Sequence, residues 1–408
     1  MSIVSGMTGA ARPQFLKAMA MATTLMMSVA VGAPAASADI LELSTPGVYV
    51  QEIDDFGAEI NPAPALQVIV GQAVIPSGAS ISVTSTAEFA ALTSSASAAI
   101  TQAVEDYFAN GGITLAVVGA QSAQPTDLIT AIDSIAVSGA LDLAVPELRG
   151  LGDGDWQEVA TELIATAVAL DAMAWLDPPA DVVGHEVSTT FSDPGGVAAL
   201  AAQLRSTAGE GAAQAVLLNG GVVDAEGQAR AATPGVLGMR SSTDTNEGQW
   251  ANMDPYPGLV GVTPEDPLPL AGLGVLTAAG VTSIFRLDDQ YTTPDIAVTL
   301  ETADDVHYAS TRRMLLWLRQ SVRAGMANYV FAPNDMSTWV SMTTMISSFL
   351  TGIWQEGGLE GNAADESFTV NCSATPDMIL NGYLQCAVRV DLITSNLQEF
   401  NLMQDQSA

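Results

Sequence analysis

The sequence predicts an α/β protein with a substantial core and room for more than one domain, and one observation supports each part of this prediction. Strand-like runs alternate with amphipathic helical runs over most of the chain, which is the pattern of strand–helix–strand units. Apolar residues make up 48% of the 408 residues and charged residues only 14%, so the chain can bury a substantial core. A chain of this length also accommodates two or three domains of about 100–200 residues each.

The first strand–helix–strand unit lies in the first third of the chain. Leu66–Gly71 is a short apolar run typical of a buried strand. A short helix follows, with Ser85 or Thr86 as its N-cap. Ile100–Asn110 is amphipathic and ends at a Gly-Gly pair, as a helix C-terminus should, and Ile113–Val118 then reads as a strand.

The same alternation continues downstream. Three further strands are expected, at Leu141–Val145, Ala172–Asp177 and Ala215–Leu218. Two helices are expected between them, at Asp155–Leu170 and Gly195–Ala208. Residues 219–269, in contrast, are rich in Gly, Pro, Asp and Thr and predict a long irregular section, which in other proteins is usually functional or ordered by a partner. The alternation of strands and helices resumes over Leu276–Arg286.

The arginine-rich segment Ser310–Arg323 has the periodicity of an amphipathic helix. Its apolar side chains form one stripe, which consists of Met314, Leu315, Leu318 and Val322. Arg312, Arg319 and Arg323 fall within a narrow arc elsewhere on the helix. In a chain with so few positive charges this arc suggests contact with a partner. The alternatives are a solvated face or ion pairs with the chain's own carboxylates.

A second helical run follows and is expected to face the core. Its apolar residues recur at helical spacing: Trp339, Met342, Ile346, Phe349, Leu350 and Ile353. Asn334-Asp335 supplies caps before this run, and Gly357-Gly358 stops it. Nothing in the run indicates a cofactor site.

The charge balance bears on the partners of this chain. Its formal net charge is −33 and its pI about 4.1. Such a field repels a phosphate backbone and therefore argues against nucleic acid as a partner. It suits a soluble component of a particle, or life at high salt. We find no membrane-spanning run and expect no membrane anchor.

The two cysteines, Cys372 and Cys386, are too few for a disulfide framework and lack the spacing of a zinc site. They lie in strand-like runs, Phe368–Cys372 and Tyr383–Val390, separated by a turn at Asn381-Gly382. We interpret them as two small, partly buried residues. Pairing across neighbouring strands, in an oxidising compartment, is the alternative.

No catalytic, cofactor-binding or metal-binding site is predicted. The two histidines, His185 and His307, have no metal-like partner at i+4 and lie in no nucleophile motif. The glycine-rich segment Gly150–Asp155 lacks the lysine of a phosphate-binding loop and the closing Glu of a calcium loop. We interpret it as a turn that leads into a helix capped at Asp155. The signals for an enzyme in the sequence are therefore weak.

The N-terminus has the anatomy of a secretory signal peptide. Arg12 and Lys17 precede an apolar run over Ala18–Val31, and Ala36-Ser37-Ala38 provides an A-x-A cleavage pattern. The run is too short to span a membrane comfortably, since a span needs about 20 apolar residues. Export is one interpretation. A flexible extension, or a start site placed upstream of the true one, is the other.

Several motifs follow one another in an order that resembles the contractile phage tail sheath family, found in myophage tails and related injection machines. They are Pro46–Glu52, Tyr107–Gly112 followed by Val117-Val118, Asp177–Pro179, Gly235–Asp244 followed by Gly248–Asn252, and the region Tyr308–Cys372. Each motif alone is weak. Together they cover most of Thr45–Phe400.

The resemblance implies a domain organisation. It consists of a leader (1–38), an N-terminal strand arm (39–60), a middle α/β domain of subtilisin-like topology (61–300, with the long loop section 219–269), an α+β C-terminal sheath domain (301–396) and a C-terminal strand arm (397–408). In the family, such arms add strands to a sheet in a neighbouring subunit. The arm residues implied here are Val48, Tyr49, Val50, Ile53, Glu399, Phe400 and Leu402.

The resemblance also implies a function. Sheath subunits polymerise helically as stacked rings around an inner tube and contract to drive that tube through a cell envelope. The implied partners are other copies of the chain, the inner tail tube protein, and baseplate and tail terminator proteins, in a virion tail assembled in the host cytoplasm. Arg312, Arg319 and Arg323 would then face the tube. The alternatives are a secreted or surface structural protein, which would explain the leader, and a secreted hydrolase.

Overall fold

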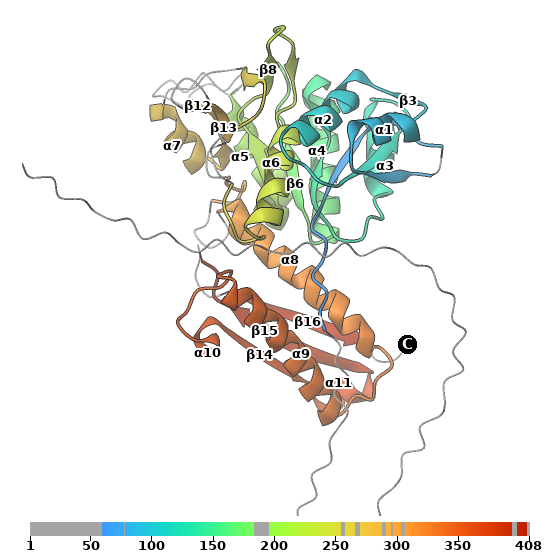
Figure 1. The fold of residues 1–408 in the computed structure, drawn as a ribbon, viewed down its shortest axis with the longest axis vertical. Helices are drawn as coiled ribbons and strands as arrows, with labels where there is room; N and C mark the ends of the chain where they lie inside the picture. The colour runs from blue at the N-terminus through green and yellow to red at the C-terminus, as the bar shows by residue number, and fades with distance from the viewer. Residues whose placement is uncertain are drawn as a thin grey trace, which may run out of the picture. The chain divides into compact units, whose positions relative to one another are not determined.

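The structure, a computed structural model, describes residues 59–76, 78–182, 196–253, 258–265, 270–287, 291–294, 297–302, 307–393 and 398–405 (Figure 1). The chain divides into two compact units, Met1–Asp54 and Asp55–Ala408, and the described residues all belong to the second. The predicted leader lies outside the described residues, and so do Val48, Tyr49, Val50 and Ile53 of the predicted N-terminal arm.

A large, mostly parallel sheet confirms the predicted α/β class. Its strands lie in the order β11 (Val281–Thr282), β7 (Ala215–Leu218), β6 (Met173–Leu176), β5 (Ala140–Ala144), β1 (Leu66–Val74), β4 (Leu115–Ala120) and β2 (Ser80–Val83). Neighbours from β11 to β4 are parallel, whereas β2 pairs antiparallel with β4, and β3 (Ser95–Ala96) antiparallel with β1. The first strand therefore lies between β4 and β5. The subtilisin-like detail stays a prediction.

The inner strands of this sheet are buried along their whole length. Every residue of β5, β6 and β7 is buried. A parallel sheet is covered on both faces, so its strands read as continuous apolar runs rather than as an alternation. For this reason the runs at 141–145, 172–177 and 215–218 predicted strands close to the observed bounds.

Helices cover both faces of the sheet, and each face has its own apolar cluster. One face packs against α3 (Pro125–Asp133), α4 (Asp153–Ala169), α5 (Val197–Ala208) and α7 (Leu270–Ala278). The other packs against α2 (Ala98–Ala109), α6 (Thr233–Asn246) and α8 (Ala309–Met326).

Two predicted helix starts can be compared with the structure. Ser85 caps α1 (Thr86–Leu92), since its side chain accepts a hydrogen bond from the Glu88 N–H. The predicted turn at 150–155 does lead into a helix, but α4 begins at Asp153 with Gly152 as its N-cap, rather than at Asp155.

The prediction of a long irregular section over 219–269 is wrong in its middle. The section contains α6 and a three-stranded sheet of β10 (Val262–Pro264), β8 (Val222–Asp224) and β9 (Ala229–Arg230). The sequence does not predict α6 because this helix contains Pro, Gly, Ser and Thr, which have low helix propensity. Packing against α2 stabilises it instead: a Cβ on Gly238 would lie 2.2 Å from the Tyr107 carbonyl oxygen, so only glycine permits this approach.

The alternation predicted to resume over Leu276–Arg286 is observed, as a helix end followed by strands. Residues 276–278 complete α7, Gly280 (φ +80°) reverses the chain, and strand structure begins only at β11. It continues in β12 (Ile284–Leu287), which pairs with β13 (Tyr291–Pro294). Leu276 is buried on α7, so one apolar run was shared between a helix end and a strand.

The C-terminal region combines helices with an antiparallel sheet, as expected for an α+β domain. After α8 come η3 (Ala327–Tyr329), α9 (Met336–Gln355), α10 (Ala364–Ser367), β14 (Phe368–Ser373), α11 (Pro376–Leu380), β15 (Tyr383–Val390) and β16 (Gln398–Asp405). The sheet order is β14-β15-β16, and α9 packs on β14 (Figure 1).

Helix α9 confirms the core-facing prediction. Asp335 is its N-cap and accepts a hydrogen bond from the Thr338 N–H at 3.1 Å. Four of the six predicted apolar positions are fully buried and two are partly buried; the buried ones are Met342, Ile346, Leu350 and Ile353.

Strand β16 coincides with the predicted C-terminal arm. It pairs antiparallel with β15 of the same chain over its whole length, from Val390↔Gln398 to Tyr383↔Asp405. Leu402 is buried by this pairing. A link to a neighbouring copy through this strand remains a prediction.

The interpretation of the cysteines as two unpaired residues is wrong. Cys372 and Cys386 lie directly opposite each other on β14 and β15 and form a disulfide. Both are buried. The strand register, which the sequence left open, decides this pairing.

Replacing both cysteines by Ala should lower the free energy of unfolding. The bond closes a loop with a sequence separation of 14, and a loop of this size predicts a loss of about 3 kcal/mol. Urea unfolding of the oxidised wild type and of the Cys372→Ala/Cys386→Ala variant measures it. Reductant should destabilise the wild type and leave the variant unchanged. If reductant lowered the free energy of unfolding of the wild type and of the variant equally, the disulfide would be contradicted.

Candidate functional site

The candidate site is a network of buried charges on α8, the helix at the start of the C-terminal region. The predicted apolar stripe of this helix is confirmed, since Met314, Leu315, Leu318 and Val322 are all buried. Arg313 is buried as well, with only 1% of its surface exposed. A guanidinium is rarely buried so completely without ionic partners, so its contacts define the site.

The first partner of Arg313 is Asp142 on β5, the one charged residue in the inner strands of the sheet. Arg313 Nε lies 2.9 and 3.0 Å from the two carboxylate oxygens of Asp142, and Nη2 donates to Oδ2 at 2.8 Å. Asp142 is 0% exposed. The planar fork of an arginine fits such a two-oxygen contact, which a lysine could not reproduce.

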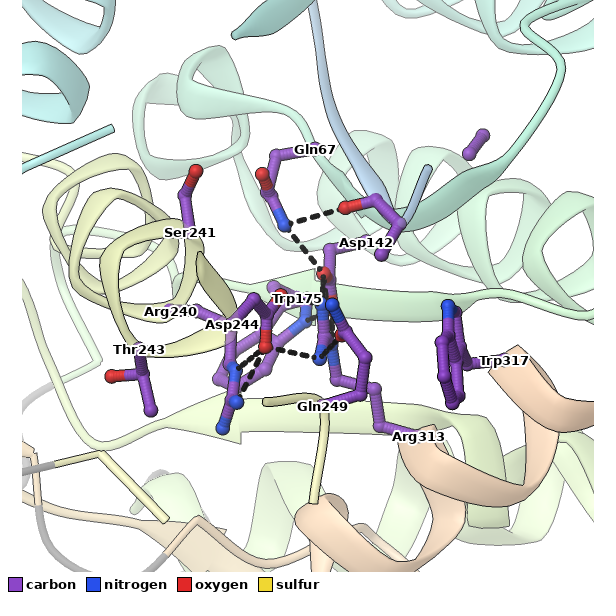
Figure 2. A network of polar contacts seen from close by, with 12 residues as sticks. Gln67, Asp142, Trp175, Arg240, Ser241, Thr243, Asp244, Gln249, Arg313 and Trp317 are labelled. Carbon is purple, nitrogen blue, oxygen red and sulfur yellow. Dashed lines mark hydrogen bonds and ion pairs between the residues drawn. The ribbon is translucent and has the colours of Figure 1, made fainter. Parts of the chain in front are cut away.

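The second partner is Asp244, on α6. Arg313 Nη1 donates to Asp244 Oδ1 at 2.9 Å and Nη2 to Oδ2 at 2.5 Å, and Nη1 also donates to Gln249 Oε1 at 2.8 Å. Asp244 is shared with Arg240, whose Nε donates to Oδ1 at 2.7 Å. Two arginines and two aspartates thus form a neutral cluster (Figure 2).

Uncharged donors complete the shell around Asp142. Trp175 Nε1 on β6 donates to Oδ1 at 2.9 Å, and Gln67 Nε2 on β1 donates to Oδ2 at 3.2 Å (Figure 2). Gln67 Oε1 in turn accepts from the Tyr107 hydroxyl at 3.0 Å. We call this set the Arg313 network: Arg313, Asp142, Asp244, Arg240, Gln249, Trp175, Gln67 and Tyr107.

Burial and charge act in opposite directions on the pKa values in this network. Burial lowers the pKa of Arg240, although Asp244 opposes the shift. For Arg313 burial also acts to lower the pKa, but Asp142 and Asp244 outweigh it and raise the pKa above its ordinary value. Burial raises the pKa of Tyr107 to about 12, so its hydroxyl stays protonated as a donor. These shifts keep the Arg313 guanidinium charged and the Tyr107 hydroxyl protonated at physiological pH.

The predicted tube-facing arginines contact the chain itself. Arg319 and Arg323 form ion pairs with Asp171, at 2.9 and 2.6 Å, and Arg312 donates to Gln214 Oε1 at 2.9 Å. For Arg319 and Arg323 the structure therefore shows the alternative of ion pairs with the chain's own carboxylates. Their role toward a tube remains a prediction.

These contacts place α8 along the amino-terminal edge of the parallel strands. Asp171 precedes β6, and Gln214 precedes β7. Gln320 Nε2 lies 2.8 Å from the carbonyl oxygen of Ala140, the first residue of β5, and 3.0 Å from that of Asp171. Helix α8 is thus tied to the sheet by side chains along most of its length, in addition to its apolar stripe.

The network is suited to holding elements together rather than to chemistry. It joins β1, β5, β6, α2, α6 and α8 without presenting a nucleophile. Within the described ranges, no group of three or more His, Cys, Asp or Glu could hold a metal ion. No described helix is long and apolar enough to cross a membrane. Nδ1 of His307 lies 3.1 Å from the Glu301 carbonyl oxygen, and His185 lies outside the described residues.

Sequence reasoning did not single out Arg313, although a signal was present. Arg313 precedes Leu316 and Trp317 by three and four residues, so it lies on an apolar face of the helix. Asp142 was the second signal, because it is a charged residue within the apolar strand-like run 141–145. A buried arginine and a buried aspartate in one chain each require a partner, which is a reason to pair them.

The comparisons with known proteins bear on the region that begins with α8. Residues 301–395 match the family model described as the phage tail sheath C-terminal domain. We refer to them as the sheath domain. The Arg313 network is therefore the attachment of the sheath domain to the α/β sheet.

Solved structures extend the likeness beyond the sheath domain. The anti-feeding prophage helical sheath in the contracted state is 21% identical, with a TM-score of 0.64, over 86% of this chain and 96% of that chain. The sheath complex of PVC, an extracellular contractile injection system, is 19% identical, with a TM-score of 0.65, over 86% and 94%. The sheath tail protein of Listeria innocua is 7% identical, with a TM-score of 0.62, over 86% and 97%.

At these identities the likeness shows that the chain has the sheath fold. Curated proteins, compared by sequence, give no match. Because the solved sheath chains are covered almost completely, the α/β sheet and the sheath domain belong to one shared architecture.

Replacing Arg313 by Met should destabilise the protein strongly. The change leaves Asp142 and Asp244 buried, with only Arg240 to compensate two negative charges. We expect the free energy of unfolding to fall by about 3–5 kcal/mol, measured by urea denaturation.

Arg389→Met, which removes an exposed arginine from β15, is the matched control and should cost less than about 1 kcal/mol. Adding Asp142→Asn and Asp244→Asn to Arg313→Met should recover part of the loss, because it removes the uncompensated charges. A loss for Arg313→Met no larger than for Arg389→Met would contradict the network's role.

Proposed function

We propose that this chain is the structural subunit of a contractile sheath, which polymerises helically around an inner tube and contracts to drive the tube through a cell envelope. The observation that carries the proposal is the fold shared with sheath chains over 86% of this chain and 94–96% of theirs. The family match of the sheath domain supports it independently. The role is structural rather than catalytic.

The proposed partners are other copies of the chain, an inner tube protein, a baseplate and a tail terminator. The anti-feeding prophage baseplate also contains a chain of this fold, with 21% identity and a TM-score of 0.64, which supports the baseplate. The tube and terminator follow from the proposed function alone. We place assembly in the cytoplasm of the producing cell, with export through the signal-like leader as the alternative.

The Arg313 network gives a physical basis for force transmission. A subunit that contracts as part of a lattice must carry load between its contacts without yielding internally. One apolar cluster runs from the α/β sheet through α8 and α9 to β14 and β15, and the buried ion pairs cross it. Load applied to the sheath domain therefore passes to the sheet through packed side chains rather than through a loop.

The sheath-domain sheet offers two edges for links between copies. Among the described strands, β14 and β16 each pair only with β15. An open edge accepts a further strand. The pairing of β16 with β15 can equally form between two copies, since strand exchange repeats the same contacts. We propose the N-terminal arm (39–60) and β16 as the links between subunits.

The sheath function is tested by electron microscopy of the purified full-length chain, alone and with an inner tube protein. We expect hollow helical tubes, and tubes of regular length when the tube protein is present. Monomers and amorphous aggregates under both conditions would contradict the proposal.

Strand exchange has a separate test that uses the observed register. Gln385 and Met403 are opposite each other on β15 and β16, one residue away from the native disulfide. In assembled tubes of the Gln385→Cys/Met403→Cys variant, oxidation should give a ladder of linked subunits on a non-reducing gel. Met403→Cys alone should give none. If the engineered disulfide formed only within single subunits, so that no ladder appeared, β16 would pair within its own chain and the proposal would be wrong.

A further inference from the structure

A groove beside α9 has aromatic walls and a floor of small residues. Its volume is about 720 Å³. Trp250, Trp317 and Phe349 form the aromatic walls, and the floor on α9 includes Ser348 and Gly352. Both floor residues are exposed, and a Cβ added to Gly352 would meet no atom within 4 Å. The floor is therefore open, and we call this site the α9 groove.

The chain enters the described part of the protein along the wall of the α9 groove. Glu59 and Ile60 line the groove, and Ile60 is buried. Two hydrogen bonds then hold the chain beside α8 (Figure 1). The Ala63 N–H donates to Ser321 Oγ at 2.9 Å, and Trp317 Nε1 donates to the Ala63 carbonyl oxygen at 2.9 Å. The residues before Glu59 thus start from a fixed point at the groove.

Phe56 is the aromatic residue nearest to this point on the N-terminal side. Only Gly57 and Ala58 separate it from Glu59. Three residues of extended chain span about 10 Å, so the phenyl ring can reach the groove from its wall. A cavity of about 150 Å³ is enough to hold a benzene ring, so the groove has room for this side chain and its backbone.

The charges at the groove favour an uncharged occupant from the same chain. Glu59 and Glu356 line the groove and are exposed, and its described lining includes no arginine or lysine. The surface of a second copy is repelled there, because each copy has a net charge of −33. Residues 56–58 carry no charge. A short tether also gives them a high effective concentration at the groove.

We propose that the Phe56 side chain binds in the α9 groove of its own subunit, against Trp250 and Phe349. Aromatic rings pack favourably in offset or edge-to-face pairs, and these two walls offer such contacts. The contact fixes the point from which the N-terminal arm leaves the subunit. This consequence rests on the proposed sheath function, in which the arm links subunits, whereas the binding of Phe56 does not.

Photocrosslinking of the full-length chain tests this contact. Phe56 is replaced by p-benzoyl-phenylalanine, which keeps an aromatic ring, and the chain is irradiated as a monomer. We expect a crosslink within the subunit, mapped by mass spectrometry to α9 or to the segment around Trp250. Ser348→Trp fills the groove from an exposed position and should remove this crosslink. Ser337→Trp, at an exposed position of α9 outside the groove, should keep it.

A second variant covers the case in which Ser348→Trp fails to fold. Gly352→Leu raises helix propensity and adds its Cβ in open space, so the chain should stay folded by circular dichroism and lose the crosslink. Crosslinks only to a second copy, no crosslink to the groove, or a crosslink unchanged in a folded groove variant would each overturn the inference. Tubes are scored separately by electron microscopy. Their absence, with the crosslink intact, would contradict the sheath function alone.

Discussion

The guanidinium of Arg313, with 1% exposure, lies between carboxylates from β5 and α6 and joins α8 to the sheet and to α6. Charge cannot be buried without compensation, so the position of Arg313 fixes the relative positions of the sheet, α6 and α8 within narrow limits. The apolar cluster on this face supplies most of the burial, but it is non-directional. The ion pairs supply direction, because each donor must reach a specific oxygen.

The two edges of the parallel sheet have different chemistry. At the amino-terminal edge, Arg312, Gln320 and Arg319 of α8 contact residues next to the strand starts, and the sheath domain is attached there. At the carboxyl-terminal edge, Glu147 and Arg149 lie in the segment after β5, and Glu147 accepts a hydrogen bond from Ser97, the N-cap of α2. The mechanical role we propose uses the first edge.

Arginine carries nearly all of the positive charge, since the single lysine is Lys17. The described arginines show a reason for this choice. Arg313 contacts two carboxylates and an amide at once, and Arg205 reaches the carbonyl oxygens of Leu300 and Ala279. A planar fork with five N–H donors satisfies such multiple contacts, whereas an ammonium would leave acceptors unpaired.

Local patterns in the sequence determined much of the fold. Continuous apolar runs predicted β1, β5, β6 and β7, and the helical spacing of apolar residues with an Asp cap predicted α9. These features depend on residues close together in the chain, whereas the resemblance to the sheath family depends on the order of several short motifs along it. The strands and helices can be predicted from the sequence because periodicity and capping act over one or two turns.

The tertiary structure alone decided the rest, because it depends on residues far apart in sequence. Helix α6 has poor intrinsic propensity and forms against α2 through Gly238. The disulfide required the register of β14 and β15. Arg313 and Asp142 are 171 residues apart, and no local pattern records their pairing. Both residues stand among apolar neighbours in the sequence, but only packing of the whole chain brings them together and makes them the attachment of α8 to the sheet.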